Sequence, residues 1–171
     1  TNEIDRIYKL PGDPRPAAIT KDDRFMYVQL SAFHGFVELD LQSGEVTRAV
    51  KWPTPDPLPP EYMDFVESPL ETQCHGIKIT PDGKELWAAT NIEGFVYVYT
   101  LPELQQKTRF RVGAHPNWIA FDAGGSTGYV TLAAEDAVAV VDGERYEVVD
   151  KLPVGRIPKR IHLVEVPVGD D

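Results

Sequence analysis

An internal repeat is the feature that most constrains what this chain can fold into. Three stretches align with one another, and each carries an aromatic residue in the same place, at Tyr27, Trp87 and Tyr129. The last two are 42 residues apart, while the first interval, of 60 residues, contains an insertion. A unit of about 42 residues is typical of one four-stranded blade of a β-propeller.

Each unit contains four short segments whose residues favour β-structure, separated by turns. The segment 95–99 alternates Phe, Val, Tyr, Val and Tyr, which suits a pleated strand. The triplet Pro81-Asp82-Gly83 is a turn, because proline presets φ and glycine accepts the left-handed conformation. The predicted strands, by position within the unit, are 16–20, 75–80 and 117–122; 25–30, 85–90 and 127–132; 36–41, 95–100 and 137–141; 46–52, 108–112 and 146–152.

The two ends of the chain predict a partial ring. Residues 4–10 resemble the fourth, outer strand of a preceding blade, and 157–166 the first, inner strand of a following one. We therefore expect an all-β, single-domain partial β-propeller of four-stranded antiparallel blades, with three complete blades and one strand at each end. Its parts are 1–11 (outer strand), 12–52 (blade), 53–73 (insertion), 74–113 (blade), 114–155 (blade) and 156–171 (inner strand).

Three blades do not close a ring, because propellers typically close with four to eight. An open ring would leave apolar faces in water, so we expect the remaining blades to come from upstream sequence or from another chain. A stacked array of four-stranded units is the alternative architecture.

Particular motifs support a family resemblance. The run Thr80-Pro-Asp-Gly-Lys-Glu-Leu-Trp-Ala-Ala-Thr-Asn91, a β-run and then 110–113 resemble the YVTN-type β-propeller repeat, and 128–131, 138–142 and 151–155 match it again. The first blade departs from the pattern, since Asp23 replaces the turn glycine and no glycine follows Lys51. The family is similar to lactonase-like seven-bladed propellers and to the haem d1 domain of nitrite reductases. The resemblance implies a seven-bladed parent ring and a periplasmic or secreted location.

Polar residues recur where the first strands of the blades begin. The alignment places Arg15, His75, Asn117 and Lys159 at equivalent positions, facing the mouth of the central channel. The loops between second and third strands open on the same face and add His34, Asn91, Glu93, Glu135 and Asp136. Convergent polar groups at one mouth predict a ligand site, and two cations there favour a small anionic ligand. Alternatively, these residues simply solvate the channel.

The insertion 53–73 is rich in proline and carboxylates and contains neither Lys nor Arg. It is predicted to be a lid or partner-binding loop on the face of the mouth, with one helical turn at 61–67. A surface excursion without function is the alternative. His115, before Pro116, is expected to order the turn that enters the third blade.

Composition narrows the classes of function. The net charge of −10 disfavours nucleic acid and anionic membrane surfaces as partners, and no apolar run is long enough to span a bilayer. The single cysteine, Cys74, forms no intrachain disulfide and no cysteine-rich zinc site; it is expected to be a small buried residue. Phosphate-loop and nucleophile-elbow motifs are absent from the sequence.

We therefore predict a module that binds a small anionic molecule or a protein partner, with no catalytic residue assigned and no cofactor or metal. One alternative is a lactonase-like hydrolase acting on an anionic lactone, with Arg15 or Lys159 holding the substrate. The other is a haem d1-type binding protein, for which His75 is the candidate axial ligand.

Overall fold

The computed structural model describes the chain except residues 1, 32, 64–72 and 165–171. Twelve strands form three antiparallel sheets of four strands each, and the order in every sheet follows the chain. The first sheet contains β1 (Asp13–Ile19), β2 (Phe25–Ser31), β3 (Gly35–Asp40) and β4 (Val46–Lys51). The second contains β5 (Cys74–Ile79), β6 (Glu85–Thr90), β7 (Phe95–Thr100) and β8 (Gln106–Arg111). The third contains β9 (Pro116–Phe121), β10 (Thr127–Leu132), β11 (Ala137–Asp142) and β12 (Glu147–Pro153).

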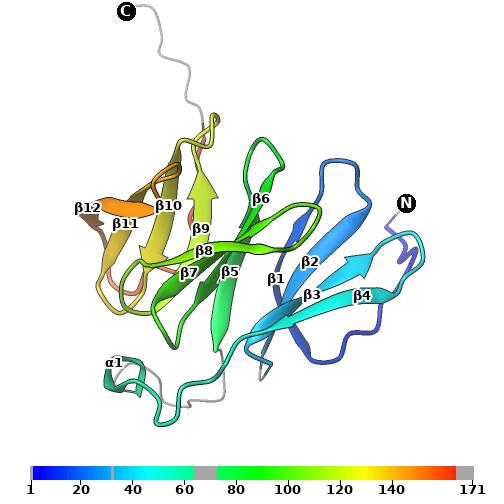
Figure 1. The fold of residues 1–171 in the computed structure, drawn as a ribbon, viewed down its shortest axis with the longest axis horizontal. Helices are drawn as coiled ribbons and strands as arrows, with labels where there is room; N and C mark the ends of the chain where they lie inside the picture. Colours follow the sequence, from blue (N-terminus) through cyan, green and yellow to red (C-terminus); the bar gives the residue numbers. More distant parts are fainter. Residues whose placement is uncertain (1, 32, 64–72, 165–171) are drawn as a thin grey trace, which may run out of the picture.

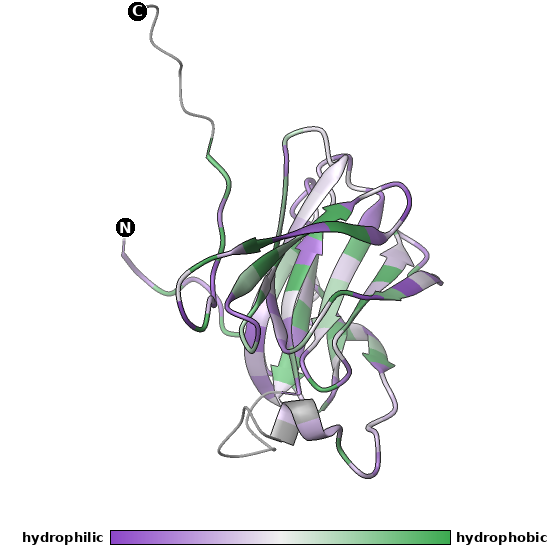
Figure 2. Ribbon diagram, turned by 90° about the vertical axis from the view of Figure 1, so that its left-hand side faces the viewer, coloured by the Kyte–Doolittle hydropathy of each residue, from purple (hydrophilic) through white to green (hydrophobic). Residues whose placement is uncertain are grey.

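The sheets stand side by side like blades, with β1, β5 and β9 as neighbouring inner strands (Figure 1). The outer strands β4, β8 and β12 carry the charged residues and have the most exposed burial patterns. The repeat-based prediction of three four-stranded blades is confirmed, and each predicted strand matches an observed one to within a few residues. Figure 2 shows that hydrophobic residues are concentrated in the strands.

The core lies between the blades rather than within them. Trp87 packs edge-on against Phe121 at 4.9 Å between ring centroids, and so joins the second blade to the third. Between the first two blades, Trp52 stacks on Tyr97 at 5.0 Å. The aromatic residues that revealed the repeat are thus packing residues between neighbouring sheets.

The guanidinium of Arg48 ties the first blade to the second. The guanidinium of Arg48 bonds to Glu38 within its own sheet, and it also donates to the backbone oxygens of Pro102 and Glu103, at 2.7 and 2.9 Å. Glu38 is buried, so its carboxylate needs such a partner.

The two terminal segments are not strands, which corrects the expectation for 4–10 and 157–166. Residues 2–10 run along the outer face of the first blade, where Arg6 and Tyr8 donate from their side chains to the backbone oxygen of Leu41, each at 2.9 Å. In 154–164, contacts with the third blade are single bonds, such as Ile157 N to Asp136 Oδ1 at 2.8 Å. Among the described residues each sheet has four strands, and neither segment pairs with any of them. Residues 165 and 166 lie outside the described part.

The insertion contains a one-turn helix, α1 (Pro60–Met63), at the end of the molecule where β5 begins (Figure 1). The turn was expected at 61–67; it starts one residue earlier, and 64–67 lie outside the described residues. The ring of Tyr62 is buried and stacks on His115 at 5.8 Å between centroids. The insertion therefore lies on the face of the predicted mouth. Among the described residues, no helix is long and apolar enough to cross a membrane.

Candidate functional site

A β-bulge interrupts each inner strand at the same place. In β1 the regular register breaks between Pro14 and Ala17, in β5 between Cys74 and Ile77, and in β9 beside Asn117. The bulged residues are Arg15 with Pro16, His75 with Gly76, and Asn117. A bulge changes the direction of the side chain at the extra residue. The same backbone distortion therefore sets the side-chain directions of Arg15, His75 and Asn117.

Gly76 allows two inner strands to approach closely. Its φ is 97°, and a Cβ at this position would lie 2.7 Å from the backbone oxygen of Asn117. Only glycine accepts both the backbone conformation and the contact. Gly76 was not among the residues predicted for the site, although a glycine within a predicted strand is a signal of close backbone approach.

His75 bridges the second blade and the third. Its Nδ1 lies 2.9 Å from the backbone oxygen of Asn117, and its ring lies 5.5 Å from that of Trp118. A carbonyl oxygen only accepts hydrogen bonds, so Nδ1 carries the proton. In the neutral ring, Nε2 then carries a lone pair, and it makes no hydrogen bond with the described residues.

The charges of three cations act on this imidazole. Burial is the main cause that lowers the pKa of His75 below its ordinary value of 6.5, and the charges of Arg15, Lys159 and Arg160 lower it further. Of the four residues that the alignment placed at the mouth, His75 is bonded to Asn117, and the charges of Arg15 and Lys159 act on His75. Two of the cations are also oriented: Arg15 donates to Ser31 Oγ, and the Arg160 guanidinium lies 5.7 Å from the centre of the Trp118 ring.

Lys159 is placed by its backbone. Thr131 Oγ1 donates to the Lys159 carbonyl oxygen at 3.0 Å, which holds the C-terminal segment against the third blade. Arg160 follows it directly and is the site residue that sequence reasoning did not find. We call Arg15, His75, Lys159 and Arg160 the basic cluster.

His34 and Glu93 form a second pair, between the first and second blades. His34 Nε2 lies 3.8 Å from Glu93 Oε2, while Nδ1 lies 3.3 Å from Thr54 Oγ1. Burial lowers the pKa of His34 to about 4. Glu93 also accepts from Tyr97 OH, at 3.1 Å. Neither residue is among the main charges that act on His75, so this pair is separate from the basic cluster.

Asn91 belongs to a buried polar group beneath α1. Its Nδ2 lies 3.1 Å from His115 Nε2, and Tyr62 covers the same imidazole. Burial, together with smaller contributions from the charges of Lys159 and His75, lowers the pKa of His115 to about 4. The His115 carbonyl accepts from Ala133 N at 3.1 Å, as expected of a residue that orders the entry to β9.

Glu135 and Asp136 hold the third blade together. Glu135 accepts from the backbone nitrogen of Ala114 and from Lys151 Nζ, each at 2.5 Å. Asp136 Oδ1 accepts from Ile157 N. The two carboxylates therefore hold the segments that enter and leave the third blade against it.

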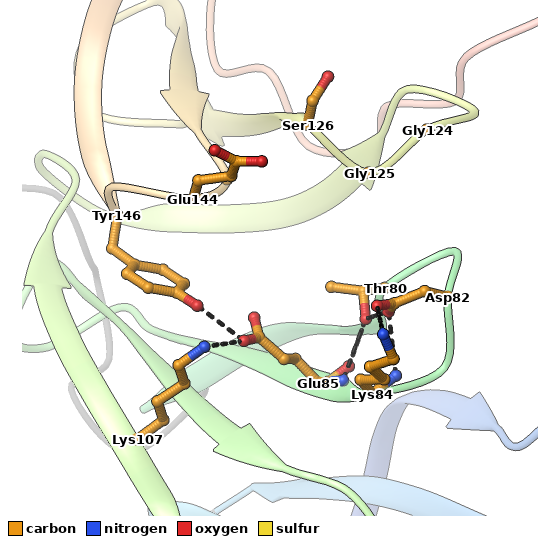
Figure 3. A pocket seen from close by; sticks show the side chains of 11 residues that line it. Thr80, Asp82, Lys84, Glu85, Lys107, Gly124, Gly125, Ser126, Glu144 and Tyr146 are labelled. Carbon is orange, nitrogen blue, oxygen red and sulfur yellow. Dashed lines mark hydrogen bonds and ion pairs between the residues drawn. The ribbon is translucent and has the colours of Figure 1, made fainter.

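A cleft of about 400 Å³ opens at the opposite end of the blades (Figure 3). Glu85 extends into it and accepts from Lys107 Nζ and Tyr146 OH, both at 2.7 Å. Trp87 Nε1 donates to the same carboxylate at 3.0 Å. Because Tyr146 belongs to the third blade and the others to the second, the carboxylate joins two blades.

The described residues contain no group of three or more His, Cys, Asp or Glu side chains that could hold a metal ion. The main charged neighbours of His75 are cations, which disfavour a metal and favour an anion.

Comparison with known proteins gives the fold. No protein-family model and no curated protein sequence matches the chain. In structure, it is similar to a hydrazine synthase of Kuenenia stuttgartiensis, with a TM-score of 0.69 and 21% identity over 93% of this chain and 41% of that one. It is also similar to the WD40 repeats of RRP9, with a TM-score of 0.63 and 15% identity over 85% of this chain and 40% of that one.

The chain is a partial β-propeller. It spans about two fifths of the length of each of these structures. At such identities the likeness concerns the fold, and one propeller scaffold supports many functions. The residues around the mouth must therefore carry the functional argument.

Proposed function

We propose that this propeller module binds a small anionic ligand at the mouth of its central channel. The observation that carries the proposal is that the charges of Arg15, Lys159 and Arg160 all act on the half-buried imidazole of His75, which is bonded to the neighbouring inner strand. An anion at this place would be attracted by all three positive charges.

The negative net charge of the whole chain contrasts with the positive charges near His75. A chain with a net charge of −10 repels anions at long range, so an anion must be held by near contacts. A guanidinium binds a carboxylate, sulfonate or phosphate through two parallel hydrogen bonds, whereas Lys159 acts as a point charge. Arg15 and Arg160 would thus orient the anion through their hydrogen bonds, and Lys159 would add positive charge.

Calorimetric titration with ethanesulfonate tests the proposal, with sodium chloride at equal ionic strength as the reference. The sulfonate stays ionised at any working pH. We expect saturable binding to the wild-type chain and at least roughly tenfold weaker binding to Arg15→Gln and Lys159→Gln, since a hydrogen bond to a charged group contributes about 1.5–3 kcal/mol.

Arg145→Gln is the matched control. Arg145 lies in the β11–β12 turn, its side chain is 74% exposed, and the substitution removes the same charge. Binding that stays equal in all variants, or no binding to wild type, would overturn the proposal. Circular dichroism of each variant separates loss of the site from loss of the fold.

A lactonase-like hydrolase is the enzymatic alternative. Glu93 and Glu135 are each bonded to other side chains, which leaves His75 Nε2 as the base that such a reaction would use. Lactone hydrolysis above background that disappears in His75→Phe would favour this alternative over a binding module.

The haem d1-type alternative fits the site less well. His75 offers a lone pair at Nε2, but three cations act on the same ring and would oppose an iron cation there. We therefore expect no change in visible absorbance when haem d1 is mixed with the protein. A protein partner that presents a carboxylate at the mouth falls under the same electrostatic proposal.

A further inference from the structure

We infer that the cleft between the second and third blades binds a guanidinium group (Figure 3). In each of the other two blades, the turn that corresponds to one wall of this cleft is bonded to an arginine side chain. The binding site is separate from the proposed anion site, which lies at the other end of the blades.

The turn that joins the third and fourth strands of a blade has the same backbone hydrogen bond in all three blades. Its first residue donates to the backbone oxygen of the residue that precedes the second strand. These bonds are Leu41 N to Arg24 O, Leu101 N to Lys84 O and Gly143 N to Ser126 O, at 2.9, 2.8 and 2.8 Å. The turns 41–44, 101–104 and 143–146 therefore correspond to one another, and each ends on a residue with a positive φ.

An arginine side chain bonds to two of these turns. In the first blade, the Arg6 guanidinium donates to the first two backbone oxygens of turn 41–44, at 2.9 and 3.2 Å. In the second blade, the Arg48 guanidinium donates to the second and third backbone oxygens of turn 101–104, at 2.7 and 2.9 Å. A guanidinium suits adjacent carbonyl oxygens because its donors form a rigid planar fork.

The turn 143–146 of the third blade has no arginine at the corresponding position. Arg48 lies opposite Glu38 in the first sheet, and the residue in the same register of the second sheet is Thr108, opposite Val98. A threonine side chain is short and uncharged, so it cannot replace a guanidinium. Among the described residues, none donates to the first three backbone oxygens of this turn.

The cleft gives a ligand access to this turn. Its volume is about 400 Å³, and Gly143 and Glu144 of the turn line it together with Lys107, the residue before Thr108. A space of this size accommodates a guanidinium with a short aliphatic stem.

The corresponding cleft between the first and second blades is less polar. It has a volume of about 360 Å³, and Phe25 and Pro102 are among the residues that line it. By position in the repeat, Glu85 replaces Phe25 and Glu144 replaces Pro102 in the cleft between the second and third blades. Carboxylates thus lie where the first cleft has apolar side chains, which favours a cationic ligand.

The charged side chains of the cleft leave one carboxylate unpaired. Lys107 Nζ lies 2.7 Å from Glu85 Oε1, and Lys84 Nζ lies 3.5 Å from Asp82 Oδ2. The exposed carboxylate of Glu144 has no partner among the described residues. A guanidinium that donates to the turn oxygens would also pair with Glu144, whereas an anion would be repelled by it.

Titration with ethylguanidinium chloride, followed through the backbone amide signals of the protein in NMR spectra, tests this inference. Ethylammonium chloride is the reference, since it carries the same charge and alkyl chain but no planar fork. We expect saturable shifts at residues 143–146 and an affinity at least roughly threefold higher for ethylguanidinium, the effect of one additional hydrogen bond. Equal affinities, or no saturable shifts at this turn, would overturn the inference and leave the anion site unaffected.

Two variants of equal charge locate the binding. Glu144→Gln should weaken ethylguanidinium binding at least roughly threefold. Glu103→Gln removes the same charge from the corresponding turn of the second blade, where Arg48 already bonds, and should leave the affinity unchanged. Equal weakening by both substitutions would overturn the inference, because it would show attraction to the net charge alone.

Thr108→Arg supplies the missing guanidinium from the chain itself. In a variant shown by circular dichroism to be folded, the new side chain should prevent ethylguanidinium from binding, and unchanged binding would overturn the inference. If this variant does not fold, the comparison of Glu144→Gln with Glu103→Gln decides.

A third probe, N-acetyl-arginine methylamide, distinguishes two sources of the group. Tighter binding than that of ethylguanidinium would indicate an arginine within a peptide, and equal or weaker binding a small guanidino compound. Either result supports a guanidinium as the bound group, whereas binding no tighter than that of ethylammonium by both guanidinium probes would overturn it.

Discussion

The imidazole of His75 and the backbone carbonyl of Asn117 connect two neighbouring inner strands, with 2.9 Å between Nδ1 and the oxygen. That same oxygen is the atom that a Cβ at position 76 would meet. The close approach of β5 and β9 and the orientation of the imidazole are therefore one structural feature.

Gly76→Ala should destabilise the fold by about 2 kcal/mol or more. The new methyl group would lie 2.7 Å from the Asn117 oxygen, and the backbone would keep a left-handed φ of 97°. Chemical denaturation monitored by tryptophan fluorescence gives the free energy of unfolding.

Gly83→Ala is the matched control for this prediction. Gly83 also has a positive φ, of 79°, but nothing lies within 4 Å of the added Cβ. Gly83→Ala should therefore lower the free energy of unfolding only by the cost of backbone strain, about 1 kcal/mol. Equal losses for the two variants would mean that the close approach at Gly76 contributes nothing.

Glu85→Gln should lower the free energy of unfolding by roughly 2 kcal/mol at neutral pH, because the half-buried carboxylate that accepts from Lys107 and, across the two blades, from Tyr146 loses its charge. Burial raises the pKa of Glu85, but bonds from Lys107, Trp87 and Tyr146 outweigh it, and the net pKa lies below 4.5. A carboxyl with a lowered pKa stabilises the fold above its unfolded pKa, and this contribution disappears as the pH falls through the folded value.

The difference between wild type and Glu85→Gln should accordingly shrink below about pH 4.5. Glu144→Gln, an exposed change beside the same cleft, should have little effect at any pH. A constant difference across the pH range would show that the ionised carboxylate is not the stabilising group.

His34 should make the fold sensitive to mild acid. Burial lowers its pKa to about 4, whereas the unfolded chain takes up a proton near 6.5. Unfolding therefore binds more protons between these values, so stability falls as the pH drops from about 6.5 toward 4. Glu93, at 3.8 Å, and Lys51 are the charged groups that face it.

His34→Asn tests this contribution, because asparagine tolerates the positive φ of 50° at this position but does not titrate. Unfolding free energies measured across this pH range should fall less steeply for the variant than for wild type. Parallel curves would show that His34 titrates alike in the folded and unfolded states.

Cys74 should be unreactive in the folded protein. It is fully buried, and burial raises its pKa to about 12, so almost no thiolate forms at neutral pH. Alkylation by iodoacetamide followed by mass spectrometry should show labelling only in denaturant. Rapid labelling under native conditions would contradict the observed packing.

The sequence predicted the blades because their signals are local. Alternating residues in 95–99 and the turn at Pro81-Asp82-Gly83 need no tertiary information. The alignment also predicts that Arg15, His75, Asn117 and Lys159 face one mouth, since equivalent positions of a propeller surround one axis. Of these residues, His75 and Asn117 are bonded to each other. Periodicity thus predicted the fold and one contact of the candidate site.

The features that the sequence did not predict depend on contacts between separate segments. Arg160 joins the site because its guanidinium reaches the Trp118 ring of the neighbouring blade. Glu135 is bonded to Lys151, which only the folded sheet brings opposite it. The terminal segments have strand-like residues yet pair with no strand of the described sheets, which no local pattern reveals.

The titration of the His75 imidazole, followed by NMR, tests the central claim most directly. We expect a neutral ring protonated at Nδ1, a pKa below 6.5 that rises when ethanesulfonate is added, and a higher pKa in ligand-free Arg15→Gln. The signal is assigned by its loss in His75→Gln. A pKa near 6.5 that neither the anion nor the loss of Arg15 changes would contradict a basic cluster at the channel mouth.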